Sequence, residues 1–286
     1  MIRSATQLKA KVRNLSGGDS MKAQTLIRNY IMERFLERLS LSRYRNNFIL
    51  KGGMLVAAVV GLDTRATIDI DTAVRSLVME RKNAARIIEE IIDVDVQDGV
   101  RFKITKVTDI MEEHDYPGIR FMLEATLDRM RQAIKIDIST GDVITPNAVE
   151  YAYDLMFEDR SITLWAYNLE TLLAEKLETV MVRGTANTRL RDFYDIHVLI
   201  QQGAIDADVL KKAFWATCEQ RNTVKLIPEL RNALAVFRSE NAMRAEWENY
   251  RKGSYFVGDL SWDEVTDSLE RLAGIVLDPE EIKDFQ

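Results

Sequence analysis

Two aspartates separated by a single residue, Asp69 and Asp71, are the clearest chemical feature of this chain. They lie on a strand-like run expected at 67–74. Side chains alternate along a strand, so both carboxylates should project from one face, about 7 Å apart at the backbone. A solvent-exposed polar strand would carry the same pattern. In a buried setting, however, carboxylates this close repel each other, and a bound divalent cation such as Mg²⁺ usually offsets that repulsion.

A glycine pair, Gly52 and Gly53, precedes the aspartates by some fifteen residues and opens an apolar helix-like segment. Glycine allows the backbone to approach a phosphate closely, although a glycine pair can equally begin a helix. Taken together, the glycines and the two carboxylates indicate a site for a metal ion and nucleotide phosphates, as in a nucleotidyltransferase.

A third carboxylate, Asp137, lies in a run where three isoleucines alternate with polar residues. Lys135, Asp137 and Ser139 therefore share the polar face of a predicted strand. In isolation this pattern describes an edge strand with one solvated face. Beside Asp69 and Asp71, it makes Asp137 a candidate metal ligand or general base.

Lys176 lies on the apolar side of a predicted helix at 169–181. A lysine in that position either extends to the edge of the helix or binds an anion, such as a nucleotide triphosphate. In the next predicted helix, Asp192 falls in the first turn, where the helix dipole favours negative charge. Asp192 could cap that helix, pair with Arg183 or Arg191, or orient Lys176 and the nucleotide.

The predicted elements follow the order helices, mixed α/β core, helical half, which is typical of an α+β fold. We expect helices at 5–15, 19–39, 54–60 and 79–92, and strands at 48–50, 67–74, 102–107, 120–127 and 134–139. From Asn168 onward, helices are expected at 168–182, 190–202, 207–221, 229–251 and 262–274. The predicted domains are 1–160 and 161–286, with the boundary in the stretch 145–165.

The composition is that of a globular chain of 286 residues, 47% hydrophobic and 29% charged. The longest apolar run, 54–60, is far below the ~20 residues of a membrane span, and the first residues lack the apolar core of a signal peptide. A single cysteine, Cys218, excludes an internal disulfide, and two histidines leave no material for a His/Cys zinc site. We therefore expect a cytoplasmic protein without membrane contact.

Charge is distributed unevenly along the chain. Residues 1–51 carry eleven basic and three acidic side chains, about +8, whereas the whole chain carries −6. Such asymmetry is typical of a segment that contacts a phosphate backbone, although a solvated helix face or a surface for an acidic partner protein would also explain it.

Six segments in this order resemble the AbiEii/AbiGii family of nucleotidyltransferase toxins, of which MenT-like toxins are one group. The segments are YIMERFLERLS (30–40), FILKGG (48–53), RATIDID (65–71), IDI (136–138), AEKL (174–177) and RDFYDI (191–196). The resemblance implies a DNA polymerase β-like core with an α-helical C-terminal half. It also implies a toxin of a bacterial toxin–antitoxin or abortive-infection system acting in phage defence, whose partner is a winged-helix antitoxin that forms no stable complex with it.

The resemblance also assigns roles to the candidate residues. Asp69, Asp71 and Asp137 are the predicted metal ligands and, with Lys176 and Asp192, the predicted catalytic residues. Nucleotide-binding candidates are Lys51, Gly52, Gly53, Arg65 and Lys176.

The predicted reaction moves a nucleoside monophosphate from an NTP to an RNA, with the tRNA 3′ end as the expected acceptor, in the presence of Mg²⁺ or Mn²⁺. Asp137 would bind a second ion or accept the hydroxyl proton, and the basic N-terminal segment would hold RNA. Two alternatives remain: transfer to a protein or small-molecule hydroxyl, and a non-catalytic NTP-binding toxin. The sequence leaves open which NTP is the donor and which residue is the general base.

Overall fold

The computed structural model describes residues 2–110, 118–186, 189–203 and 205–277. The chain divides into two compact units. Unit 1 comprises residues 1–58, 66–142 and 149–166, and unit 2 comprises 59–65, 143–148 and 167–286. Two short segments from the N-terminal part of the sequence, 59–65 and 143–148, thus belong to the second, helical unit.

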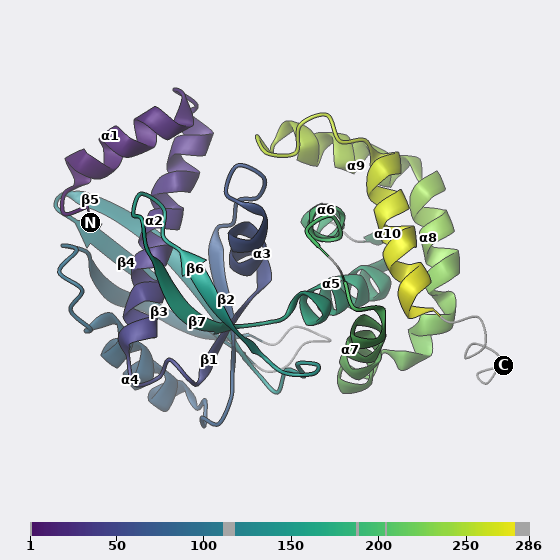
Figure 1. Ribbon diagram of the computed structural model, residues 1–286, viewed down its shortest axis with the longest axis horizontal. Helices are drawn as coiled ribbons and strands as arrows, with labels where there is room; N and C mark the ends of the chain where they lie inside the picture. The colour runs from purple at the N-terminus through teal and green to yellow at the C-terminus, as the bar shows by residue number, and fades with distance from the viewer. Residues whose placement is uncertain (1, 111–117, 187–188, 204, 278–286) are drawn as a thin grey trace. The chain divides into compact units, whose positions relative to one another are not determined.

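Unit 1 is built on a seven-stranded mixed sheet with the order β3-β4-β5-β2-β1-β7-β6 (Figure 1). The strands are β1 (Phe48–Lys51), β2 (Asp69–Val74), β3 (Arg101–Ile110), β4 (Gly118–Leu127), β5 (Met130–Thr140), β6 (Val149–Asp154) and β7 (Ser161–Ala166). The central strand β2 runs parallel to β5 and antiparallel to β1, while β4 is antiparallel to both β3 and β5. The sheet therefore brings β2 and β5, the two predicted carboxylate strands, side by side.

One face of the sheet is apolar and covered by helices. Unit 1 contains α1 (Ala5–Ser16), α2 (Ser20–Leu41), α3 (Gly52–Val60, whose last two residues fall in unit 2) and α4 (Arg81–Ile92). Helix α2 packs against β5, and α4 packs against β3. Alternate side chains of β4 and β5, such as Phe121 and Ile136, are fully buried on this face. By strand alternation, the intervening polar side chains, Asp137 among them, lie on the opposite face.

Helix α2 is buried on nearly all sides and carries charged residues into the interior. Arg38 forms a forked pair with Asp98, with hydrogen bonds of 2.7 and 2.8 Å, and Arg34 pairs with Glu37 at 2.7 Å. Burial raises the pKa of Glu33 to about 8, and the Arg34 guanidinium opposes this rise. Buried ion pairs inside unit 1 therefore neutralise part of the positive charge of the N-terminal segment.

Unit 2 is helical and has its own aromatic core. Its α-helices are α5 (Leu169–Arg183), α6 (Leu190–Leu199), α7 (Ala207–Gln220), α8 (Leu230–Ser239), α9 (Asn241–Lys252) and α10 (Trp262–Val276). Phe193 lies against both Phe237 and Trp262, with ring centroids 5.6 and 5.3 Å apart. Ser261 begins α10 through a reciprocal capping box with Glu264, as the sequence predicts.

The α+β fold class is confirmed, with two local differences. The structure places two strands, β6 and β7, in the stretch around 145–165 that was predicted as a domain boundary. They pair with each other as an edge hairpin of six-residue strands. The predicted helix 229–251 is two helices, since Glu240 adopts an extended conformation and its side chain caps α9. Of the residues that the structure describes, none form a helix long and apolar enough to cross a membrane.

Candidate active site

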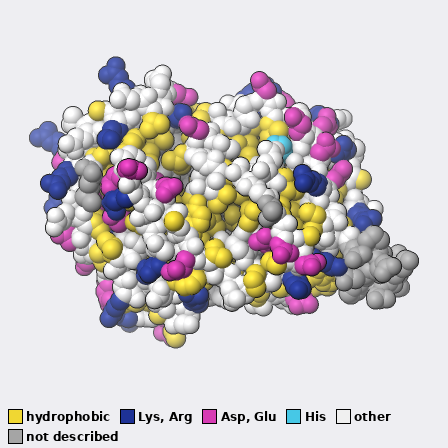
Figure 2. Space-filling view, viewed as in Figure 1, with side chains coloured by type: hydrophobic (Ala, Val, Ile, Leu, Met, Phe, Trp, Pro, Cys, Tyr) yellow, Lys and Arg dark blue, Asp and Glu magenta, His cyan; other side chains and the backbone are white. Residues whose placement is uncertain are grey.

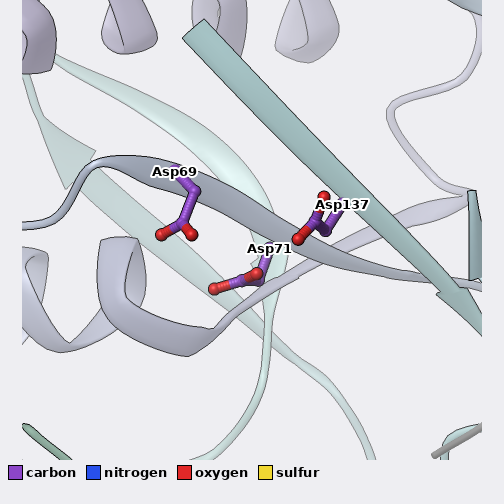
Figure 3. Close-up of side chains that lie close together, drawn as sticks. All are labelled: Asp69, Asp71 and Asp137. Carbon is purple, nitrogen blue, oxygen red and sulfur yellow. The ribbon is translucent and has the colours of Figure 1, made fainter. Parts of the chain in front are cut away.

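Three carboxylates converge on the polar face of the sheet. In the parallel pairing of β2 with β5, Asp71 lies directly opposite Asp137, and Asp69 lies two residues before Asp71 on the same face. Figure 3 shows the three side chains pointing toward one another. Each offers an oxygen atom, and these atoms all lie within 4.8 Å of one another. The alternation in sequence predicts the same-face pair, whereas strand register supplies the third member.

Asp71 is the most perturbed group of this triad. Burial is the main cause that raises its pKa, from 3.8 to about 7, and the negative charges of Asp69 and Asp137 raise it further. Lys51 and Lys135 act in the opposite direction but do not cancel these effects. Burial and neighbouring carboxylates thus disfavour the ionised form of Asp71, a condition that a divalent cation relieves.

Two cations on neighbouring strand positions hold the outer carboxylates in place. Lys135 Nζ lies 2.6 Å from Asp69 Oδ2 and 3.4 Å from Asp137 Oδ2. Arg120 on β4 lies opposite Asp137 and donates two hydrogen bonds of 2.8 Å to its two oxygens. Sequence reasoning missed both residues as members of the site. The shared polar face of Lys135 and Asp137 was a usable signal for Lys135, whereas Arg120 depends on the β4–β5 register.

The glycine pair adjoins the triad through β1, whose last residue, Lys51, lies opposite Asp71. Gly52 adopts a positive φ of +62°, and a Cβ added there would stand 2.1 Å from Asp71 Oδ2. Both the backbone conformation and the space therefore demand glycine at this position. Gly53 follows within the first turn of α3.

Side chains around the triad fix its neighbours. Lys51 Nζ contacts Asp142 Oδ1 at 2.5 Å, and Asp142 also accepts a hydrogen bond from Ser139. The hydroxyl of Thr67 donates to Asp69 Oδ1 at 3.0 Å. Asp142 lies two residues after the end of β5 and was not among the predicted site residues.

The remaining predicted residues form a separate charged cluster within unit 2. Lys176 is only 8% exposed, and its Nζ contacts Asp195 Oδ2 at 2.5 Å and Asp192 Oδ1 at 3.1 Å. Arg65 pairs with the same Asp195 through Nε and Nη2, at 2.5 and 3.2 Å.

The electrostatics of this cluster favour its charged form. Burial alone would raise the pKa of Asp195, but Arg65 and Lys176 outweigh burial and lower it. The second oxygen of Asp192, Oδ2, is buried and has no hydrogen-bond partner among the described residues. The anion that the buried Lys176 contacts in the structure is thus a pair of carboxylates on α6.

Comparison with known proteins identifies the family. The model of the family described as nucleotidyl transferase AbiEii toxin, type IV toxin–antitoxin system, matches residues 34–268. The chain belongs to the AbiEii family. This assignment confirms the predicted enzyme class, a nucleotidyltransferase, and the type IV system implies a cognate antitoxin.

Solved structures agree with the AbiEii fold. JHP933 from Helicobacter pylori aligns with a TM-score of 0.51 at 14% identity, covering 92% of this chain and 94% of its own. A second Helicobacter pylori chain, assigned as a nucleotidyltransferase, aligns with a TM-score of 0.52 at 14% identity, covering 92% and 98%. A search of curated protein sequences finds no significant match. At such identities the structural likeness shows the fold alone, and the family match carries the enzyme class.

The triad fits a divalent cation by its chemistry. All three donors are carboxylate oxygens, the ligand type that Mg²⁺ and Mn²⁺ prefer, and they lie on one face within reach of a single ion. Burial, Asp69 and Asp137 together raise the pKa of Asp71, so its ionised form is disfavoured without a further cation.

Proposed function

We propose that this toxin transfers a nucleoside monophosphate from an NTP to a hydroxyl of an RNA, releasing pyrophosphate, with the 3′ end of a tRNA as the expected acceptor. The observation that carries this proposal is the convergence of Asp69, Asp71 and Asp137 on one sheet face, beside Gly52, where any Cβ would collide with Asp71. A phosphate can approach such a backbone closely, and the carboxylates can hold the cation that accompanies a triphosphate.

In this proposal, Asp69, Asp71 and Asp137 hold Mg²⁺, or Mn²⁺ in its place. A bound cation of this kind polarises the α-phosphate and neutralises charge on the leaving pyrophosphate. The protein's own groups prepare the site: Thr67 and Lys135 orient Asp69, and the forked bonds from Arg120 orient Asp137. Asp137 is proposed either to help hold the cations or to accept the proton of the attacking hydroxyl.

The nucleotide is proposed to lie against Lys51, Gly52 and Gly53, where β1 passes into α3. Lys51 is the cation on this segment, and the positive φ of Gly52 keeps the backbone free of a side chain beside Asp71.

In unit 2, Lys176 and Arg65 remain the candidates for the triphosphate, and Asp192 remains the residue that orients Lys176. The observed contact of 3.1 Å between Lys176 Nζ and Asp192 Oδ1 supports that pairing.

The decisive experiment incubates the purified full chain with each α-labelled NTP in turn and total bacterial RNA, with Mg²⁺, Mn²⁺ or a chelator. We expect label on a tRNA-sized band for one NTP, no label with the chelator, and no label for Asp71→Asn. Asp154→Asn, an exposed aspartate of β6, serves as a control that should label RNA normally.

Three results would contradict the proposal. Label on protein instead of RNA would move the acceptor to a protein hydroxyl. Labelling that survives the chelator would remove the role given to the cation. Full labelling and full toxicity of Asp71→Asn on expression in bacteria would remove the catalytic role of the triad.

A further inference from the structure

The polar face of the sheet does not end at the carboxylates but continues across β4 to the edge strand β3. Strand register places four rows of side chains on this face, one row for each alternate position of β4. The rows are Thr108-Arg120-Asp137, Lys106-Met122-Lys135, Lys103-Glu124-Ala133 and Arg101-Thr126-Arg131. We call this set of twelve residues the open face.

The open face is strongly basic. It carries six basic residues (Arg101, Lys103, Lys106, Arg120, Arg131 and Lys135) and two acidic ones (Glu124 and Asp137), so its formal charge is 6 − 2 = +4. This contrasts with the net charge of −6 of the whole chain. A surface with a net positive charge therefore leads to the triad.

The charges of the open face differ in how far they are already paired. Close to the triad, Arg120 and Lys135 are bound to Asp137 and Asp69. At the far end, Arg131 is 74% exposed and stands 3.8 Å from Glu124.

Arg101, Lys103 and Lys106 on β3 are exposed and have no ion-pair partner among the described residues. Within the part of the chain that the structure describes, these three charges are open to an external anion. Figure 2 shows Lys and Arg side chains at the end of unit 1 where Figure 1 draws the N-terminus and the start of β5.

Lysine on an edge strand has a simpler explanation, because it discourages pairing with other sheets. That explanation covers β3, which is the edge of the sheet. It does not cover Arg120, Arg131 and Lys135, which lie on inner strands and continue the positive charge toward the carboxylates. A charged path over three strands that ends at a transferase site is instead suited to a polyanion.

We propose that the open face binds the phosphate backbone of the RNA acceptor and leads its end from Arg101 and Arg131 toward the triad. This rests on the proposed function, because it names the surface by which that acceptor is held. The distance along β5 from Arg131 to Asp137 is six residues, about 20 Å. Binding through a row of lysines and arginines to phosphates should be strong at low salt and weak in sequence preference.

This surface differs from the one that the charge distribution of the sequence indicates. Of the eleven basic residues in 1–51, Arg34 and Arg38 are buried and paired, and Lys51 is bound to Asp142. Exposed basic residues remain on α1, among them Lys9, Lys11 and Arg13. These provide a matched control, because they offer the same number of exposed charges in the same unit but outside the open face.

The test compares two triple variants of the full chain with equal loss of charge. The first is Arg101→Gln with Lys103→Gln and Lys106→Gln, and the control is Lys9→Gln with Lys11→Gln and Arg13→Gln. Binding of labelled tRNA is measured by fluorescence anisotropy from 50 to 300 mM salt, without NTP or divalent cation. Circular dichroism and NTP binding, which should equal wild type in both variants, confirm that the triad is intact.

For three lost phosphate contacts, the slope of log K against log salt should fall by about 2, at ~0.7 for each contact. At 0.1 M salt this corresponds to an affinity lower by about 100-fold. RNA labelling by the open-face variant should fall accordingly at subsaturating RNA, whereas the α1 variant should keep both its slope and most of its affinity.

Separate outcomes distinguish this inference from the proposed function. If the wild type labels RNA and the open-face variant binds and labels RNA equally well, the inference is overturned and the proposed function stands. A larger loss in the α1 variant also overturns it and assigns the RNA to α1. Unchanged RNA binding with lost binding of the antitoxin would make the open face a protein surface. A wild-type chain that neither binds nor labels RNA overturns both.

Discussion

Substitution of Asp71 by asparagine should make the cation-free protein more stable at pH 8, although it removes a residue of the proposed active site. Burial together with Asp69 and Asp137 raises the pKa of Asp71 from 3.8 to about 7. The folded state then binds a proton more tightly than the unfolded state, so ionisation works against folding. The resulting penalty is absent below about pH 4, grows as the pH rises to 7, and is constant above it.

The size of this penalty follows from the difference between the two pKa values of Asp71. A pKa that is higher by about three in the folded state lowers the free energy of unfolding by about 4 kcal/mol once Asp71 is ionised, at 1.36 kcal/mol per pKa unit. Asp71 is only partly shielded from solvent, so this value is an upper limit, and we expect a gain of about 2 to 3 kcal/mol for Asp71→Asn at pH 8. In a unit of this size that corresponds to a rise in Tm of about 5 to 10 °C.

The assay is thermal or urea denaturation of wild type and Asp71→Asn in a chelating buffer, from pH 4.5 to 8.5. The two curves should coincide near pH 4.5 and separate as the pH rises. Added Mg²⁺ should then stabilise the wild type and leave the variant unchanged, because only the wild type retains the complete triad.

Asp98→Asn provides a control of opposite sign, since Asp98 is a buried aspartate paired with Arg38. Losing that pair should cost about 3 to 5 kcal/mol at every pH tested. Equal or lower stability of Asp71→Asn at pH 8, with a pH profile parallel to wild type, would refute the reasoning that burial and the neighbouring carboxylates raise the pKa of Asp71.

Three further predictions concern Gly52, Lys176 and the affinity of the triad for Mg²⁺. Gly52→Ala should lower transferase activity by about 100-fold, because its Cβ displaces Asp71. Gly17→Ala, with a φ of +59° but open space around it, should lose only about 1 kcal/mol of stability and no activity. Lys176→Met should lower the Tm by breaking a buried charge cluster and should also weaken NTP binding, so an unchanged NTP Kd would contradict its assignment to the triphosphate. The affinity for Mg²⁺, measured by calorimetry, should fall by about tenfold from pH 8 to pH 6 as Asp71 gains its proton, and a flat profile would count against the raised pKa.

The sequence predicted those features that depend on neighbours along the chain. Alternation placed Asp69 and Asp71 on one face, and the apolar pattern of α5 placed Lys176 on the inner side of its helix, where the structure finds it. The expected helices 19–39, 168–182 and 262–274 also begin close to the observed starts, because a capping side chain and its backbone partner are at most three residues apart.

Features that depend on strand register could not be predicted in the same way. Arg120 reaches Asp137 only because β4 pairs antiparallel with β5 in one particular alignment, and a slip of one residue would turn Arg120 to the apolar face. The edge hairpin β6–β7 was missed although Ile162 and Leu164 alternate with exposed residues, since six-residue strands give only a weak periodic signal.

The same distinction explains why charge counted along the sequence indicates a different surface for RNA from the one that we propose from the structure. Counting assigns each basic residue to its segment, and by that measure residues 1–51 stand out. Folding buries Arg34 and Arg38 of that segment and gathers Arg101, Arg120 and Arg131 from three strands onto one face. Attraction of a polyanion depends on how close charges lie in space, within a Debye length of about 10 Å at 0.1 M salt. Neighbouring strands are only about 4.8 Å apart and alternate residues about 7 Å apart, so charges in the same or adjacent rows of the open face meet that condition. Successive rows then act in turn on a phosphate chain that approaches the carboxylates.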